Sequence, residues 1–313
     1  MPKWLNLYRS ETNYFQFAWC EVLSYNLGMR LRSSSVLGLV VFGACGFAQT
    51  PAVNPSRIYN AASFGPQPVA PGSIVSIYGT NLASSLAKAG SIPLSTSLAD
   101  VTVTVNNLPA PLFFVAPDPV NGDQINLQMP WEAQQVIPPG TNGTVQIVVT
   151  NKGVKSAPVN VLVSNTAPGI FAVRYDQGNY ITDGTGQAIA YGNLDGIIAA
   201  PVNSLPGLTT QPAKINDPNT LVILATGLGA VDIPVASGNN AKDGQIHRTV
   251  VTPEVLVGNV PAQVVFSGLS PEFVGAYQMN IVIAPGTPTG VQPLQIRMNG
   301  ITTTNKVTIA VTN

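Results

Sequence analysis

A long passage of this sequence is written twice, and that repeat restricts the fold more than any other feature does. The first copy, VTVNNLPAPLFFVAPDPVNGDQINLQMP, begins at Val103, and the second, VLVGNVPAQVVFSGLSPEFVGAYQMNIVIAP, begins at Val255. Both pass through Asn-x-Pro-Ala, an apolar stretch ending in Phe, a turn rich in Pro and Gly, Gln-x-Asn, and an apolar run closed by proline. Because order, spacing and turn residues agree together, we interpret the chain as two copies of one structural unit.

The correspondence extends on both sides of the quoted passages. Downstream, VQIVVTNKGVKSAPVNVLV matches LQIRMNGITTTNKVTIAV, and upstream, VSIYGTNLA matches LVILATGLG. In the upstream match Asn81 lies opposite Gly227, and these two residue types best tolerate a left-handed backbone. Each copy would span about 100 residues, the size of an immunoglobulin-like sandwich. The positions that agree at constant separation are Val103 with Val255, Val105 with Val257, Asn107 with Asn259, Pro109 with Pro261, Ala110 with Ala262, and Phe114 with Phe266.

Short apolar runs separated by turn residues fill the region after residue 49. SIVSIYGTNLA, DVTVTVNNLPA and GTVQIVVTNKG are examples, and their alternation and β-branched residues are typical of strands. Charged residues make up only 9% of the chain, so long amphipathic helices would lack charged solvent-facing sides. The sequence therefore predicts an all-β fold, made of two tandem immunoglobulin-like β-sandwiches joined by a β-hairpin connector.

The predicted boundaries follow from the repeat. We expect the first sandwich at residues 49–165, the connector at 166–208 and the second sandwich at 209–313. The connector contains Asp-Gly pairs at 183–184 and 195–196, which favour hairpin turns. It is too apolar for a free linker, and we expect it to pack; its apolar residues include Ile170, Phe171, Val173, Ile181 and Ile189.

The segment MRLRSSSVLGLVVFGACGFAQT, from Met29, reads as a secretory signal peptide at residues 29–48. It has a basic start, an apolar run, and small residues Gly46 and Ala48 before a cleavage point. The alternative is a buried or membrane-spanning helix, but the run is short for a span of about 20 residues. Residues 1–28 have no place in such a signal, and we interpret them as a mis-annotated N-terminal extension. The expected location is secreted or at the cell surface.

The two cysteines decide whether the exported chain could carry a lipid anchor or disulfides. FGAC at 42–45 faintly resembles a lipoprotein box, which would make Cys45 a lipid anchor, although Phe42 replaces the usual leucine. Cleavage after Ala48 would instead remove both Cys20 and Cys45. The mature chain would then fold without disulfides or metal thiolates. No membrane span is expected after cleavage, and the net charge of +0 gives no electrostatic footprint for nucleic acid.

These motifs resemble a known family, the uncharacterised immunoglobulin-like C-terminal domain of exported acidobacterial proteins, which is akin to IPT/TIG domains. The resemblance covers residues 58–313. It rests on NAASFGPQPVAPGSIVSIYGTNLA, QINLQMPWE, APGIF, GTGQAIAYGNLDG, LATGLG and GNVPAQVVFSGLSPEFVGAYQMNIVIAP. It implies the fold and export, and it supplies no activity, cofactor or site residue.

No catalytic motif is apparent. The single histidine, His247, lies between Asp243 and Arg248, and a loop histidine explains it better than a general base does. DPVNGD and YITDGTGQ could offer oxygen ligands to calcium, but ordinary turn chemistry explains both. The glutamates after the signal, Glu132, Glu254 and Glu272, are dispersed, so nothing places two of them across a cleft as a glycosidase requires. We therefore expect no enzyme, no cofactor and no metal site.

A binding surface is the remaining functional candidate. Trp131 is the only tryptophan of the mature chain, and Tyr175, Tyr180 and Tyr191 gather in the connector. Aromatic rings could form a sugar platform, or they could pack on the adjacent sheets with their hydroxyls in water. The sequence thus predicts a non-catalytic exported protein for cell-envelope or extracellular binding and assembly, with an unknown protein or glycan partner. A carbohydrate-binding accessory module is the alternative, and a secreted hydrolase comes third.

Overall fold

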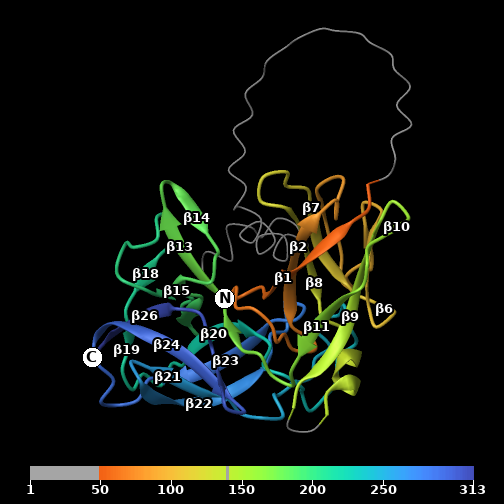
Figure 1. Ribbon diagram of the computed structural model, residues 1–313. Coiled ribbons are helices and arrows are strands. Elements are labelled where there is room, and N and C mark those ends of the chain that lie inside the picture. Colours follow the sequence, from red (N-terminus) through yellow and green to blue (C-terminus); the bar gives the residue numbers. More distant parts are fainter. Residues whose placement is uncertain (1–48, 139–140) are drawn as a thin grey trace.

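The computed structural model describes residues 49–138 and 141–313 (Figure 1). The predicted extension at 1–28, the signal peptide at 29–48 and Cys45 therefore lie outside the described residues. Within them the regular secondary structure is almost entirely β-strand, with the single 3-10 helix η1 (Trp131–Val136). The all-β sandwich prediction is confirmed. No helix in the described ranges is long and apolar enough to cross a membrane.

Two sheets form the first sandwich. Sheet A has the order β1 (Ala52–Asn60), β2 (Ile74–Thr80), β8 (Asp123–Gln128), β7 (Leu112–Ala116) and β3 (Ala87–Lys88). Sheet B has the order β10 (Val154–Lys155), β9 (Gly143–Asn151), β5 (Val101–Val105) and β4 (Ser97–Leu98), with β11 (Val159–Val163) on β9 and β6 (Leu108–Pro109) on β5.

The second sandwich is one continuous sheet that folds over itself, because the long strand β22 (Val260–Leu269) pairs with β21 (Glu254–Val257) and then with β23 (Tyr277–Val282). We call its halves sheet C and sheet D. Sheet C contains β12 (Gly169–Ile170), β16 (Ala190–Gly192), β17 (Ile198–Ala199), β18 (Thr210–Gln211), β20 (Leu221–Thr226), β22 and β23. Sheet D contains β21, β13 (Ala172–Asp176), β15 (Gly186–Ala188), β19 (Ala213–Lys214), β24 (Gly290–Met298), β25 (Ile301–Thr302) and β26 (Val307–Thr312); β14 (Asn179–Ile181) extends it from β13.

The two copies of the repeat adopt the same local structure. Asn107 and Asn259 both have left-handed backbones, with φ of 68° and 66°. Phe114 pairs with Asn126 just after a bulge in β7, and Phe266 pairs with Asn280 just after a bulge in β22. Because register, bulge and turn geometry all agree, the two passages fold as two versions of one unit.

One proline accounts for a difference in strand length. Pro111 in the first copy corresponds to Gln263 in the second. At this position the first copy is divided into β6 and β7, whereas β22 of the second copy continues without a break. Proline has no N–H to donate to a ladder, so the ladder is interrupted at this position.

The connector strands belong to the sheets of the second sandwich. β12 and β16 both pair with β20, and β15 pairs in parallel with β26. The hairpin β13–β14 turns at Gln177-Gly178, and the β16–β17 turn contains Asp195-Gly196. Residues 166–208 therefore complete the second sandwich as well as linking it to the first.

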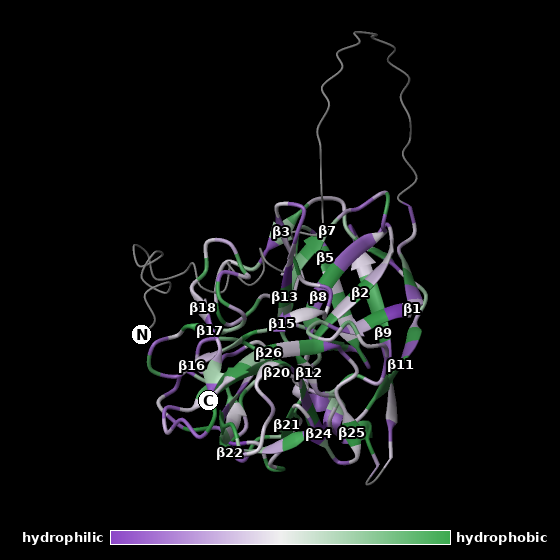
Figure 2. Cartoon of the chain, turned by 90° about the vertical axis from the view of Figure 1, so that its left-hand side faces the viewer, coloured by the Kyte–Doolittle hydropathy of each residue, from purple (hydrophilic) through white to green (hydrophobic). Residues whose placement is uncertain are grey.

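Each sandwich has its own apolar core, and a third buried cluster joins them. Strands β7 and β20 are buried along their whole length, so sheets A and C are covered on both faces. The shared cluster contains Ile74 and Phe114 from sheet A and Val222 and Leu224 from sheet C. In Figure 2 hydrophobic and hydrophilic segments both occur along the strands, as strands with one face on a core and the other toward solvent require. The order of layers is therefore B, A, C, D, with A packed against C.

Candidate functional site

Trp131 lies at the junction of the two sandwiches. Its ring covers Gly72, where an added Cβ would come within 2.3–2.4 Å of ring carbons. Its backbone N–H donates to the Ser237 hydroxyl at 3.0 Å, and that hydroxyl donates to Glu132 at 2.9 Å. The ring packs against the core of the second sandwich. Trp131 thus joins two domains in this structure, and only part of its surface reaches solvent.

The connector tyrosines separate into two places. Tyr175 and Tyr180 form an edge-to-face pair with ring centroids 5.1 Å apart, and Tyr175 is 40% exposed. The Tyr180 hydroxyl donates to the Pro206 carbonyl at 2.5 Å. Tyr191 packs on the cluster shared by the sandwiches, and burial raises its pKa. The structure brings Tyr175 and Tyr180 together and leaves Tyr191 elsewhere.

His247 is buried, with 2% of its surface exposed. Its Nδ1 lies 2.7 Å from the Ile233 carbonyl oxygen and its Nε2 lies 3.0 Å from a carboxylate oxygen of Asp243. Both partners are acceptors, so the protonated imidazolium, which donates from both nitrogens, satisfies both contacts. Burial alone would lower the pKa of His247, but the bonds to Ile233 and Asp243 raise it on balance. The hydrogen bond from His247 lowers the pKa of Asp243 to about 2. This arrangement closes a loop.

The two calcium-like strings are stabilised turns. In DPVNGD, one Asp118 oxygen accepts the N–H groups of Val120 and Asn121, both at 2.9 Å, and Asp123 accepts the N–H of Asp118 at 2.9 Å. Burial would raise the pKa of Asp118, but these N–H donors lower it. In the described ranges, no group of three His, Cys, Asp or Glu side chains lies close enough to hold a metal ion.

The second string, YITDGTGQ, is held by an ion pair. Arg174 donates from Nε to Asp183 at 2.8 Å, and the other Asp183 oxygen accepts from Thr185. Burial would raise the pKa of Asp183, but the bonds from Thr185 and Arg174 lower it. Both strings therefore follow ordinary turn chemistry.

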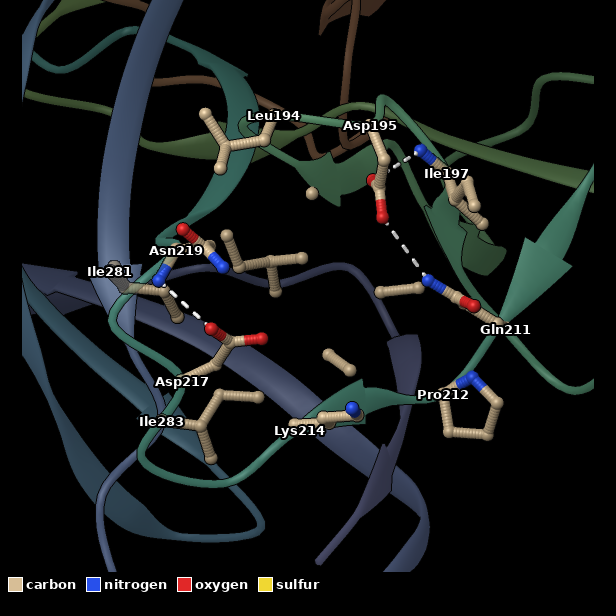
Figure 3. A pocket seen from close by; sticks show the side chains of 14 residues that line it. Leu194, Asp195, Ile197, Gln211, Pro212, Lys214, Asp217, Asn219, Ile281 and Ile283 are labelled. Atoms are coloured by element: carbon tan, nitrogen blue, oxygen red, sulfur yellow. Dashed lines mark hydrogen bonds between the residues drawn. The ribbon is translucent and has the colours of Figure 1, made fainter.

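A pocket of about 280 Å³ lies at one end of the second sandwich (Figure 3). Its walls come from both sheets, since the β16–β17 turn belongs to sheet C and β19 belongs to sheet D. Figure 3 shows the Asp195 and Asp217 carboxylates facing the same space, and Lys214 and Gln211 also line it. Buried Ile281 and Ile283 close the inner end. The sequence reasoning had not singled out these polar residues.

Turn geometry orients both carboxylates of this pocket. Asp195 accepts the N–H of Ile197 at 2.9 Å and the Gln211 amide at 3.3 Å, while Asp217 accepts the N–H of Asn219 at 2.9 Å. A Cβ at position 192 would come within 2.3 Å of Asp195 Oδ1, so glycine is needed there to seat the carboxylate. The pocket therefore presents fixed acceptors beside the amine of Lys214.

The corresponding end of the first sandwich is filled. After β8 the chain forms η1, and Ala133 and Ile137 enter the same buried cluster as Leu127 and Met129. After β23 the chain instead turns directly into β24, and the segment carrying Ala213 and Ile215 packs there only partly buried. The two copies therefore differ at this end, and the pocket exists in the second copy.

A second concave surface, a groove of about 990 Å³, lies beside the loop 117–123. Arg57 lines it and stacks over Tyr78 with 4.4 Å from Cζ to the ring centroid. The Tyr78 ring lies 6.0 Å from that of Tyr59, and burial raises the pKa of Tyr78 to about 12. Arg57 lies over one face of the Tyr78 ring and donates to the Asn121 carbonyl. Sequence reasoning missed this cluster, although its tyrosines lie on paired strands.

Comparison with known proteins yields weak structural likenesses. The plexin A4 extracellular region is 13% identical, with 91% of this chain and 17% of that chain covered and a TM-score of 0.22. Yersinia pseudotuberculosis InvD is 14% identical, and the match covers 84% of this chain and 56% of that chain with a TM-score of 0.21. Domains 5–6 of the S-layer protein SbsC are 11% identical, and the match covers 84% of this chain and 99% of that chain with a TM-score of 0.20.

This chain thus spans less than a fifth of the plexin A4 chain and about half of the InvD chain. No curated protein matches the sequence. The IPT/TIG domain model matches residues 62–166, which are almost all of the first sandwich. The chain therefore contains an IPT/TIG domain, and that domain is the first copy of its repeat.

Proposed function

We propose that this chain is a non-catalytic exported protein that binds a partner in the cell envelope or the extracellular space. The observation that carries the proposal is how the titratable side chains are used. Asp118, Asp183, Asp195 and Asp217 accept hydrogen bonds within their own turns, and His247 closes a loop. General acid–base chemistry needs such groups placed around a reacting atom. The IPT/TIG match supports a binding role in addition.

Export is part of the same proposal. We infer that residues 29–48 direct secretion and that cleavage after Ala48 leaves a chain held by core packing alone. We also infer that the region 58–313 as a whole belongs to the immunoglobulin-like family of exported acidobacterial proteins. The boundaries 49–165, 166–208 and 209–313 remain a proposal, in which the connector moves with the second sandwich because its strands pair there.

Rigidity supports a binding function. The Ile74 N–H donates to Thr226 at 3.0 Å, and the Asn60 amide donates to the Ala167 carbonyl at 2.8 Å. Hydrogen bonds therefore join the first sandwich to the second copy and to the connector. Two domains held in one orientation present a fixed surface, which reduces the ordering cost of binding.

The test uses the chain secreted with its own leader. Its N-terminus is sequenced, and its binding to isolated envelope polysaccharide and to envelope protein fractions is measured by co-sedimentation, while the supernatant is assayed for released sugars and peptides. We expect an N-terminus at Gln49, saturable binding and no released product. Catalytic release of product, or binding to neither fraction, would contradict the proposal. An N-terminus at a lipidated Cys45 would contradict free secretion alone.

A carbohydrate-binding role is the second candidate, and the pocket of Figure 3 favours it. Carboxylate, amide and amine groups line that pocket together. Tyr175 and Tyr180 offer an alternative surface, since both lie on the β13–β14 hairpin and Tyr175 is exposed. The binding assays above separate glycan from protein partners.

A further inference from the structure

The pocket of the second sandwich combines hydrogen-bond acceptors and donors in one small space. Asp195 and Asp217 supply carboxylate oxygens, and a carboxylate has about four lone-pair positions, so the contacts to Ile197, Gln211 and Asn219 leave acceptor capacity on both. None of the ion pairs found in the described part of the chain involves Lys214. Its ammonium therefore remains a donor that lines the pocket.

This mixture fits hydroxyl groups better than it fits a charged ligand. A hydroxyl donates one hydrogen bond and accepts others, so it can bridge a carboxylate and an ammonium at once. The two carboxylates outnumber the one ammonium, which disfavours an anion. The apolar side chains of Leu194, Ile197 and Pro212 lie on the same walls and can contact C–H groups. A ring bearing hydroxyls on its edge and C–H on its faces meets both requirements.

Size and position restrict the ligand further. Small-molecule sites run from about 300 to 1,000 Å³, and this pocket has about 280 Å³. It therefore suits a single sugar ring. It is closed at the inner end by Ile281 and Ile283, so a glycan can enter only with its terminal unit.

We propose that the open end of the second sandwich binds the terminal neutral sugar residue of an envelope or extracellular glycan, through Asp195, Asp217, Lys214 and Gln211. The inference rests on the proposed binding function and names its ligand class. The first copy cannot take part in the same way, because η1 fills the corresponding end. Within the part of the chain that the structure describes, the proposed sugar site therefore lies in the second copy.

The experiment starts with the full secreted chain on an array of bacterial and plant glycans. Each glycan that binds is followed by calorimetric titration with the methyl glycoside of its terminal residue. The variants are Lys214→Ala, Asp217→Asn and Gly192→Ala, the last of which displaces the Asp195 carboxylate. The matched control is Lys155→Ala, an exposed lysine on β10 of the first copy.

We expect binding of a neutral terminal sugar, and an affinity about fivefold lower in each of the first two variants, since a hydrogen bond contributes about 1 kcal/mol. Gly192→Ala should lower affinity at least as much, and Lys155→Ala should leave it unchanged. Thermal unfolding confirms that each variant is folded. No array signal with retained binding to envelope protein overturns the sugar site and leaves the proposed function standing. Glycan binding that all three pocket variants leave unchanged places the sugar elsewhere and also overturns it. Loss of all envelope binding would overturn the proposed function itself.

Discussion

Phe114 and Phe266 occupy the same position in the two copies, next to the same bulge and opposite the same asparagine, yet their surroundings differ. Phe114 is fully buried in the cluster between sheets A and C. Phe266 is half-buried and lies beside Arg248, with 5.1 Å from Cζ to the ring centroid. The repeated sequence therefore sets the backbone, while contacts between the copies decide how much each side chain contributes to stability.

This asymmetry gives the largest expected effect. Phe114→Ala should lower the free energy of unfolding by about 3–5 kcal/mol, because a fully enclosed ring leaves a cavity behind. Phe266→Ala should lower it by about 1 kcal/mol, since solvent and the Arg248 side chain already border that ring. Chemical denaturation with both variants in matched buffers measures the difference. Equal losses would mean that the copies do not depend on their mutual interface.

The loops after β2 and β20 provide a second comparison. In the first copy this connection contains β3 and β4, whereas in the second it is closed by His247 and reaches back to the first sandwich. The Gly238 N–H donates to Gln128 at 2.6 Å, and the Leu94 N–H donates to the Gly238 carbonyl at 2.9 Å. The second loop therefore links His247 to the contact between the two sandwiches.

We expect the stability of this loop to depend on pH. A histidine whose pKa is raised in the folded state stabilises that state in its protonated form. The contribution of His247 is complete below the unfolded pKa of about 6.5 and disappears as pH rises through the raised folded value. Asp243, whose pKa is lowered to about 2, contributes above about pH 4 and loses its contribution as pH falls through about 2. The pair should therefore stabilise the chain most between about pH 4 and 6.5.

His247→Gln tests this dependence, because His247 is the sole histidine of the chain. The variant should be less stable by about 1–3 kcal/mol at pH 5.5, since a buried imidazolium that donates two hydrogen bonds is replaced by a neutral amide. The difference from the native chain should shrink as the pH is raised to 9. Calorimetric Tm values from pH 5 to 9 at constant ionic strength measure it. Parallel profiles would show that folding leaves the pKa of His247 unchanged.

The duplicated fold could be predicted because its signals are local. Strand alternation, turn asparagines and the order of motifs depend on residues close in sequence, and the structure confirms the all-β sandwich. The hydrogen bonds of the Gln124 and Gln278 side chains could not be predicted from the sequence in the same way. Each amide donates to the asparagine two residues along its own strand, at 3.0 and 3.2 Å.

The candidate site could not be predicted, because its parts lie far apart in sequence. Asp195, Lys214 and Ile281 meet only after β16–β17, β19 and β23 are brought to one end of the sandwich. Trp131, which the sequence offered as one residue of a possible ligand surface, packs against the core of the second sandwich and over Gly72 of the first. A useful sequence signal exists in hindsight: the residues between Pro130 and Gly143 have no counterpart between Pro285 and Gly290, and the pocket lies at that end of the second copy.

The turn that each copy forms at its repeated asparagine should contribute equally to stability in the two copies. Asn106-Asn107 and Gly258-Asn259 each connect paired strands with two positive φ values, the geometry of a type I′ turn. Asn107→Ala and Asn259→Ala should each cost about 1 kcal/mol, because alanine tolerates this backbone less well than asparagine. Glycine at either position should be tolerated. The double alanine variant should equal the sum of the single variants within about 0.5 kcal/mol, since the turns share no partner. Urea denaturation measures all three. Unequal single costs would show that the interface strains one turn, so that even the most local feature of the repeat is altered by its neighbour.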